Sequence, residues 1–128
     1  MKYVTVADIH DEVLNCRSED LEYANAFLSR LARNYGVDEQ EAQIPPSAVI
    51  KRLGAAVACR ECAAAMVGQD TTVMVNGNRT DDVYLQKYHL YRDVVNDLQK
   101  GLSYADFAKH GTSSAGKGGV GVISLSRS

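Results

Sequence analysis

Three cysteines are the side chains of this sequence best suited to chemistry. Cys59 and Cys62 form a C-x-x-C pair, and Cys16 lies far upstream. A redox C-x-x-C needs its first cysteine at a helix N-terminus, where the dipole lowers the thiol pKa, but the apolar pattern places Cys59 well inside a helix. A zinc site needs four ligands, and neither Cys16 nor the histidines recur at ligand spacing. We therefore expect Cys59 and Cys62 to be small buried thiols, which is how free cysteines usually behave, and we expect no metal site.

No other group of residues forms a convincing catalytic motif. The glycines between Gly116 and Gly121 match G-x-G-x-x-G, but the helix that such a phosphate-binding turn requires does not follow them. Arg60 and Glu61 interrupt an apolar helix, and we expect a structural ion pair or a helix edge that reaches solvent. The sequence thus predicts no catalytic residue, no cofactor and no enzyme activity.

Tyrosines form a stripe near the end of the chain. Tyr84, Tyr88 and Tyr91 recur at steps of four and three, in register with Val95 and Leu98. Aromatic rings can stack on nucleic acid, but this stripe lacks basic neighbours and the formal net charge is −2. A tyrosine buries a large apolar body and keeps one polar group, so these three are predicted core or interaction residues.

Small residues form one face of an alanine-rich helix. Gly54, Ala58 and Cys62 follow each other at steps of four. A glycine inside a helix costs about 1 kcal/mol relative to alanine, which indicates that Gly54 is there for close packing. We list the three as interaction candidates, because such a face lets another backbone approach closely.

The apolar periodicity predicts the helices that position these residues. A first helix is expected over about 6–15, after a capping box that begins at Thr5. A second runs from Leu21 to Tyr35, with Ser18 or Asp20 as cap and Gly36 as its stop. The remaining helices are expected from Pro46 to Val67, from Tyr84 to Leu102, and as a short turn from Ser103 to Phe107.

The segment 69–80 separates the last two long helices and differs in character. Thr71 to Val75 is β-prone, and Asn76-Gly77 favours a tight hairpin turn. We expect a β-hairpin or loop here, with Val73, Met74, Asn76 and Gly77 as interaction candidates.

The C-terminal segment 111–128 is rich in glycine and serine and contains no acidic residue. That composition predicts a flexible tail. Its end is β-prone, and Val120, Val122, Ile123 and Leu125 are candidates for adding a strand to a neighbour's sheet. An ordinary frayed terminus is the alternative.

Length and composition predict one mainly α domain. The chain has 128 residues, 45% of them hydrophobic and 23% charged, which is ordinary for a globular protein. We expect a small bundle of about four helices over 1–110, with the hairpin or loop between its last two long helices, and a tail over 111–128. No signal peptide or membrane-spanning stretch is apparent, and the odd cysteine count favours reduced thiols in a cytoplasm.

The order of these parts resembles the head–tail connector (adaptor) proteins of tailed phages and prophages, including Mu-like prophages. The resemblance rests on the start Tyr3-Val4-Thr5-Val6-Ala7-Asp8, the amphipathic helix, the Pro-initiated Ala-rich helix and the Tyr-rich helix that follows Asp82. It covers about residues 1–107.

The resemblance implies a structural protein of the virion that is assembled in the bacterial cytoplasm. Its partners would be copies of itself in a ring, the portal protein, and the stopper or tail proteins, with DNA only passing through the channel. Two other classes stay open. One is a small cytoplasmic metal or redox protein that uses Cys16, Cys59 and Cys62, and the other is a helical regulatory module that binds a protein or DNA.

Overall fold

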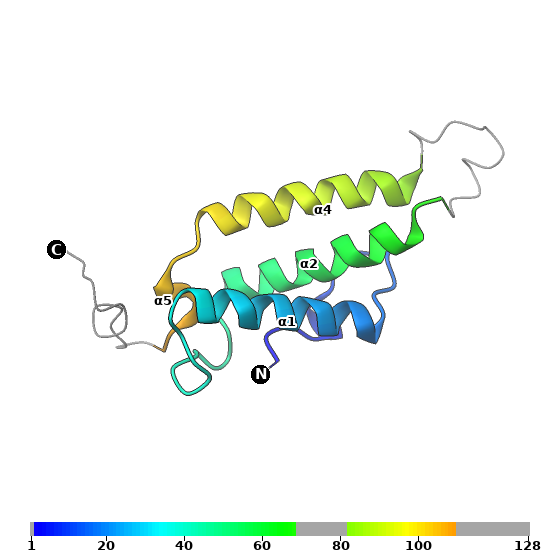
Figure 1. Ribbon diagram of the computed structural model, residues 1–128. Coiled ribbons are helices and arrows are strands. Elements are labelled where there is room, and N and C mark those ends of the chain that lie inside the picture. The colour runs from blue at the N-terminus through cyan, green and yellow to red at the C-terminus, as the bar shows by residue number, and fades with distance from the viewer. Residues whose placement is uncertain (1, 69–81, 110–128) are drawn as a thin grey trace.

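Helix α2 is the element on which the others pack. The structure, a computed structural model, describes residues 2–68 and 82–109. They form the 3-10 turn η1 (Val6–Asp8) and the helices α1 (Ser18–Asn34), α2 (Ala48–Met66), α4 (Val83–Lys100) and α5 (Tyr104–Phe107). Each long helix runs antiparallel to the next long helix in the chain, and α1 and α4 lie on different sides of α2 (Figure 1). The predicted mainly helical bundle is confirmed, and no strand occurs within the described ranges.

Small residues let α2 sit at the centre. Nine of its residues are buried, among them Leu53, Gly54, Ala58 and Cys62. A Cβ atom at Gly54 would lie 2.8 Å from Leu28 Cδ1 of α1 and 3.0 Å from Val4 Cβ. The close packing predicted for this glycine is therefore found within the chain, between α2, α1 and the N-terminal segment.

Side chains and a glycine fix the two ends of α1. The Asp20 carboxylate accepts a hydrogen bond from the Arg17 amide (2.9 Å), so Asp20 stabilises the helix start from its first turn. At the other end Gly36 adopts a positive φ of 82°. The Val37 amide then donates to the Ala32 carbonyl at 2.9 Å, which closes the helix as the sequence predicted.

The predicted helix over 6–15 is wrong. Its capping box is present, since the Thr5 amide donates to the Asp8 carboxylate (2.9 Å), but only the single turn η1 follows. The Asp11 carboxylate accepts hydrogen bonds from the amides of Val13 (2.8 Å) and Leu14 (3.0 Å). These bonds to a side chain replace the backbone hydrogen bonds that a helix would form here. Val6 and Val13, which would lie on the apolar face of such a helix, are exposed.

One carboxylate joins the end of α2 to the start of α4. Asp82 is the N-cap of α4 and accepts from the amides of Tyr84 (2.9 Å) and Leu85 (3.4 Å). Its second oxygen accepts from the amide of Gly68 at 2.6 Å, just past α2. The expected hairpin or loop over 69–80 lies outside the described residues.

The short helix α5 closes the opposite end of the bundle (Figure 1). Ser103 and Asp106 form the capping box of this predicted turn, and Phe107 is buried against the Tyr35 ring. Backbone bonds from Gln43 to Phe107 (2.8 Å) and from Lys109 to Glu41 (2.7 Å) join it to the α1–α2 connection. The expected tail over 111–128 lies outside the described residues.

None of the helices in the described ranges has the length and apolar character needed to cross a membrane.

Candidate functional site

The fold brings together the three cysteines that the sequence leaves apart. The Cys16 Sγ lies 3.9 Å from the Cys59 Sγ, although the two residues are 43 positions apart. The Cys62 thiol is one helical turn further along α2 and contacts the Asn15 carbonyl at 3.5 Å. Cys59 and Cys62 are buried, as predicted, and Cys16 is partly exposed. No spacing pattern points to Cys16, because the position of this residue depends on the loop before α1.

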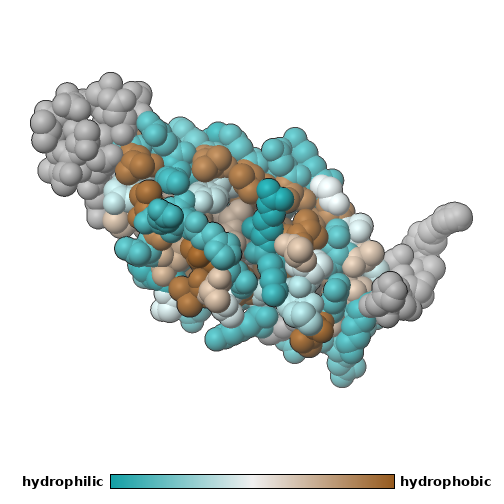
Figure 2. Space-filling model, turned by 180° about the vertical axis from the view of Figure 1, so that it is seen from behind, coloured by the Kyte–Doolittle hydropathy of each residue, from teal (hydrophilic) through white to brown (hydrophobic). Residues whose placement is uncertain are grey.

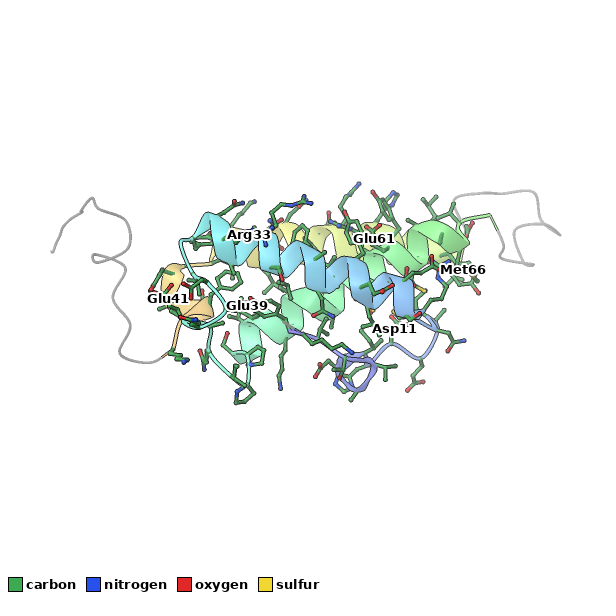
Figure 3. The ribbon with its side chains drawn as sticks, turned by 60° about the horizontal axis from the view of Figure 1, so that its bottom comes forward. Asp11, Arg33, Glu39, Glu41, Glu61 and Met66 are labelled. Atoms are coloured by element: carbon green, nitrogen blue, oxygen red, sulfur yellow. The ribbon has the colours of Figure 1, made fainter. Side chains whose placement is uncertain are left out.

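A second polar group, which the sequence pattern missed, holds that loop against α4. The Asp11 carboxylate accepts hydrogen bonds from Lys87 Nζ (2.9 Å) and from the Tyr91 hydroxyl (2.5 Å). Its side chain is only 2% exposed. Figure 3 shows Asp11 toward the end of the bundle that carries Met66, far from Glu39 and Glu41. Asp11 thus ties the segment that carries Cys16 to α4.

The electrostatics of Asp11 follow from these bonds. Burial raises the pKa of this carboxyl, but the bonds from Tyr91, Lys87 and two backbone amides outweigh burial and lower the pKa to about 2. Burial and the bond donated to Asp11 raise the pKa of Tyr91. The pair is therefore a neutral phenol bound to an ionised carboxylate, which is a structural anchor.

The thiols divide into two kinds. Donation of the Cys16 S–H to Cys59, together with burial, raises the pKa of Cys16. The same hydrogen bond lowers the pKa of Cys59, against the opposing effect of burial. Burial raises the pKa of Cys62 to about 12, so Cys62 stays protonated at neutral pH. Cys59 is thus the cysteine of the cluster whose pKa is lowered, and the lowering comes from its contact with Cys16. Within the described residues no group of three or more His, Cys, Asp or Glu side chains is placed to hold a metal ion.

The tyrosine stripe of α4 faces this cluster. Tyr84, Tyr88 and Tyr91 are partly buried and pack against the small core that contains Leu14, Cys59, Cys62 and Ala63. The Tyr91 hydroxyl donates a hydrogen bond to Asp11 inside the molecule. The stripe therefore covers the core of the monomer.

The small-residue candidates also lie inside. Gly54, Ala58 and Cys62 are all buried, and Gly54 packs against Leu28 and Val4. Arg60 and Glu61, further along α2, form the expected ion pair (3.1 Å), with the Arg60 guanidinium 5.8 Å from the centre of the Phe27 ring. The remaining interaction candidates lie outside the described residues: Val73, Met74, Asn76, Gly77, Val120, Val122, Ile123 and Leu125.

An apolar groove that the sequence did not predict lies between the N-terminal segment and α1. It encloses about 410 Å³ and is lined by Val4, Val6 and Leu21, with Lys2 and Glu22 among its polar neighbours. Val6 is 66% exposed. Asn25 of α1 fixes the position of the segment, because its side chain bonds the Tyr3 and Val4 amides and the Val4 carbonyl.

Comparisons with protein families, with curated proteins and with solved structures found no match to this chain.

Proposed function

We propose that this protein is a structural subunit of the head–tail connector of a tailed phage or prophage. Copies would form a ring that binds the portal protein on one side and stopper or tail proteins on the other. Support comes from the order of parts that carries the resemblance: amphipathic α1, the Ala-rich α2 after Pro45 and Pro46, and α4 with its tyrosines. Such a subunit is assembled in the bacterial cytoplasm and becomes part of the virion.

The observation that carries the proposal is the apolar groove beside Val6. A ring forms when each subunit uses one surface to bind a different surface of the next. Val6 and Leu21 line a concave surface with Lys2 and Glu22 nearby, and apolar centres with polar rims are typical of protein interfaces. The other large apolar residues that are exposed in the described ranges do not line this groove: Val13, Tyr23, Ile44 and Leu90. Figure 2 shows apolar residues in several separate places among hydrophilic ones on one face of the molecule.

The charge of the chain supports the expectation that DNA passes through the ring channel without being bound by this protein. A protein that grips DNA neutralises phosphates with Lys and Arg. This sequence has 14 Lys and Arg against 16 Asp and Glu. Passage of DNA through a ring channel does not require contacts between basic side chains and the phosphates. We therefore propose that DNA passes through the channel and is not a bound partner.

The test is assembly of the purified full chain, alone and mixed with portal rings, followed by sedimentation velocity and electron microscopy. Val6→Asp should abolish assembly while its thermal midpoint stays that of the wild type, because Val6 is 66% exposed. Leu90→Asp is the matched control: Leu90 is 50% exposed on α4, away from the groove, and the variant should assemble. A wild-type chain that neither forms rings nor binds the portal would contradict the proposed function. Normal assembly of Val6→Asp would exclude the groove from the interface.

A further inference from the structure

The Cys16–Cys59 pair is placed as two thiols that can join. A disulfide needs its sulfur atoms about 2 Å apart, and here they are 3.9 Å apart with one thiol donating to the other. Cys59 is fixed in the middle of α2, whereas Cys16 lies in a loop just before α1. The two sulfur atoms can therefore come within bonding distance if Cys16, the loop residue, moves toward Cys59.

The loop around Cys16 is anchored on both sides, so the contact is built into the fold. Upstream, Asp11 binds Lys87 and Tyr91 of α4. Downstream, the Arg17 guanidinium binds Asp20 through two nitrogens, at 3.1 and 2.9 Å. These contacts present Cys16 to Cys59 each time the chain folds.

Exposure separates the roles of the two sulfurs. Cys16 is partly exposed and can meet a small oxidant, while Cys59 is 3% exposed and can meet only Cys16 or its other neighbours. The hydrogen bond from the Cys16 thiol lowers the pKa of Cys59, against the opposing effect of burial. A thiolate is the form of cysteine that attacks sulfur, so Cys59 suits the second step of a disulfide-forming reaction.

We propose that Cys16 and Cys59 form a thiol oxidation site, at which a peroxide converts the pair into an intramolecular disulfide. The pair enters the reaction with one proton between its two sulfur atoms, as the Cys16 thiol donating to the Cys59 thiolate. When that proton shifts to Cys59, the Cys16 thiolate attacks one peroxide oxygen. The O–O bond breaks, Cys16 becomes a sulfenic acid, and the departing hydroxide takes the proton from Cys59 to give water. The Cys59 thiolate then attacks the Cys16 sulfur, the S–S bond forms and hydroxide leaves. Two electrons pass from the sulfur pair to the peroxide. This site does not depend on the proposed connector function.

The sequence offers a direct way to map the bond. Trypsin cleaves after Arg17 and after Arg60, so Cys16, Cys59 and Cys62 end in three different peptides. The reduced full chain is treated with hydrogen peroxide, alkylated after denaturation and digested. We expect the intact mass to fall by about 2 Da before alkylation, one thiol to remain alkylatable, and the Cys16 peptide to be joined to the Cys59 peptide.

Two variants separate the roles of the thiols. Cys62→Ala should form the same bond at the same rate. Cys59→Ala should form none. Its Cys16 sulfenic acid should form more slowly, because Cys59 no longer takes the Cys16 proton, and should persist so that dimedone traps it. A bond from Cys16 to Cys62, a bond between two chains, or a Cys16 sulfinic acid without any bond in the wild type would overturn the proposal. The wild-type peptide map decides the question even where Cys59→Ala does not fold.

Discussion

Replacement of Gly54 by alanine tests how closely α1 and the N-terminal segment pack on α2. The new Cβ would lie 2.8 Å from Leu28 Cδ1, 3.0 Å from Val4 Cβ and 3.1 Å from Val4 Cγ1. Leu28 and Val4 are 0% and 1% exposed, so neither side chain has free space into which it could turn. The added methyl group must therefore push α1 or the N-terminal segment away from α2.

Two effects of opposite sign determine how much Gly54→Ala changes the free energy of unfolding. Alanine is more favourable than glycine inside a helix by about 1 kcal/mol. Overpacking a well-packed core costs about 1–3 kcal/mol. Three carbon atoms at or below 3.1 Å place this site toward the costly end of that range. We expect Gly54→Ala to lower the free energy of unfolding by about 1–2 kcal/mol and the thermal midpoint by about 4 °C or more.

The assay is thermal and urea unfolding followed by circular dichroism. Gly101→Ala is the matched control, since Gly101 caps α4 with a negative φ of −96° and the nearest atom to a new Cβ, the Leu98 carbonyl oxygen, is 4.0 Å away. It adds the same methyl group in open space and should not lower the midpoint. A Gly54→Ala midpoint equal to or above that of the wild type would refute the close packing.

Two carboxylates carry further predictions. Asp82→Ala leaves three backbone amides without their acceptor at the α2–α4 junction, and we expect a loss of about 2–4 kcal/mol in urea unfolding. Asp97→Ala on the exposed face of α4 should change stability by less than about 0.5 kcal/mol, and equal losses for the two variants would contradict this role of Asp82. The pKa of Asp11 is lowered from 3.8 to about 2, so its contribution to stability is complete above pH 4 and is lost as the pH falls toward 2. The loss amounts to about 2 kcal/mol, and Asp11→Asn should remove this part of the pH dependence. A wild-type stability that does not differ from that of Asp11→Asn in its pH dependence between pH 5 and 2 would show that the carboxylate is not held by its partners.

The helices of this protein could be predicted from local signals. Apolar residues at steps of three and four mark α1 and α4. Gly36 and Gly68 mark helix ends, and both adopt the positive φ that glycine tolerates best. The Ser103–Asp106 box marks α5 in the same way. These signals work because each depends on residues within one or two turns of each other.

The candidate sites could not be predicted in that way, because they depend on contacts distant in sequence. Asp11 binds Lys87 and Tyr91 across 76 and 80 positions, and no pattern near Asp11 indicates partners on another helix. The same holds for Cys16 and Cys59. Asp82 is a different case, since an aspartate before an apolar helical run is a recognised N-cap signal. Its bond to Gly68, however, appears only in the folded chain.

The N-terminal segment links the two proposals in physical terms. It has little regular structure of its own beyond η1, so its position depends on side-chain contacts with three helices. Asn25 of α1 holds it near Val4, Asp11 holds it to α4, and Cys16 meets Cys59 of α2. Val6, on the groove, lies between the first two anchors. A disulfide at Cys16 would make the third contact covalent and restrict the same segment that presents Val6. If both proposals hold, the oxidised chain should therefore bind its neighbour with less loss of conformational entropy than the reduced chain.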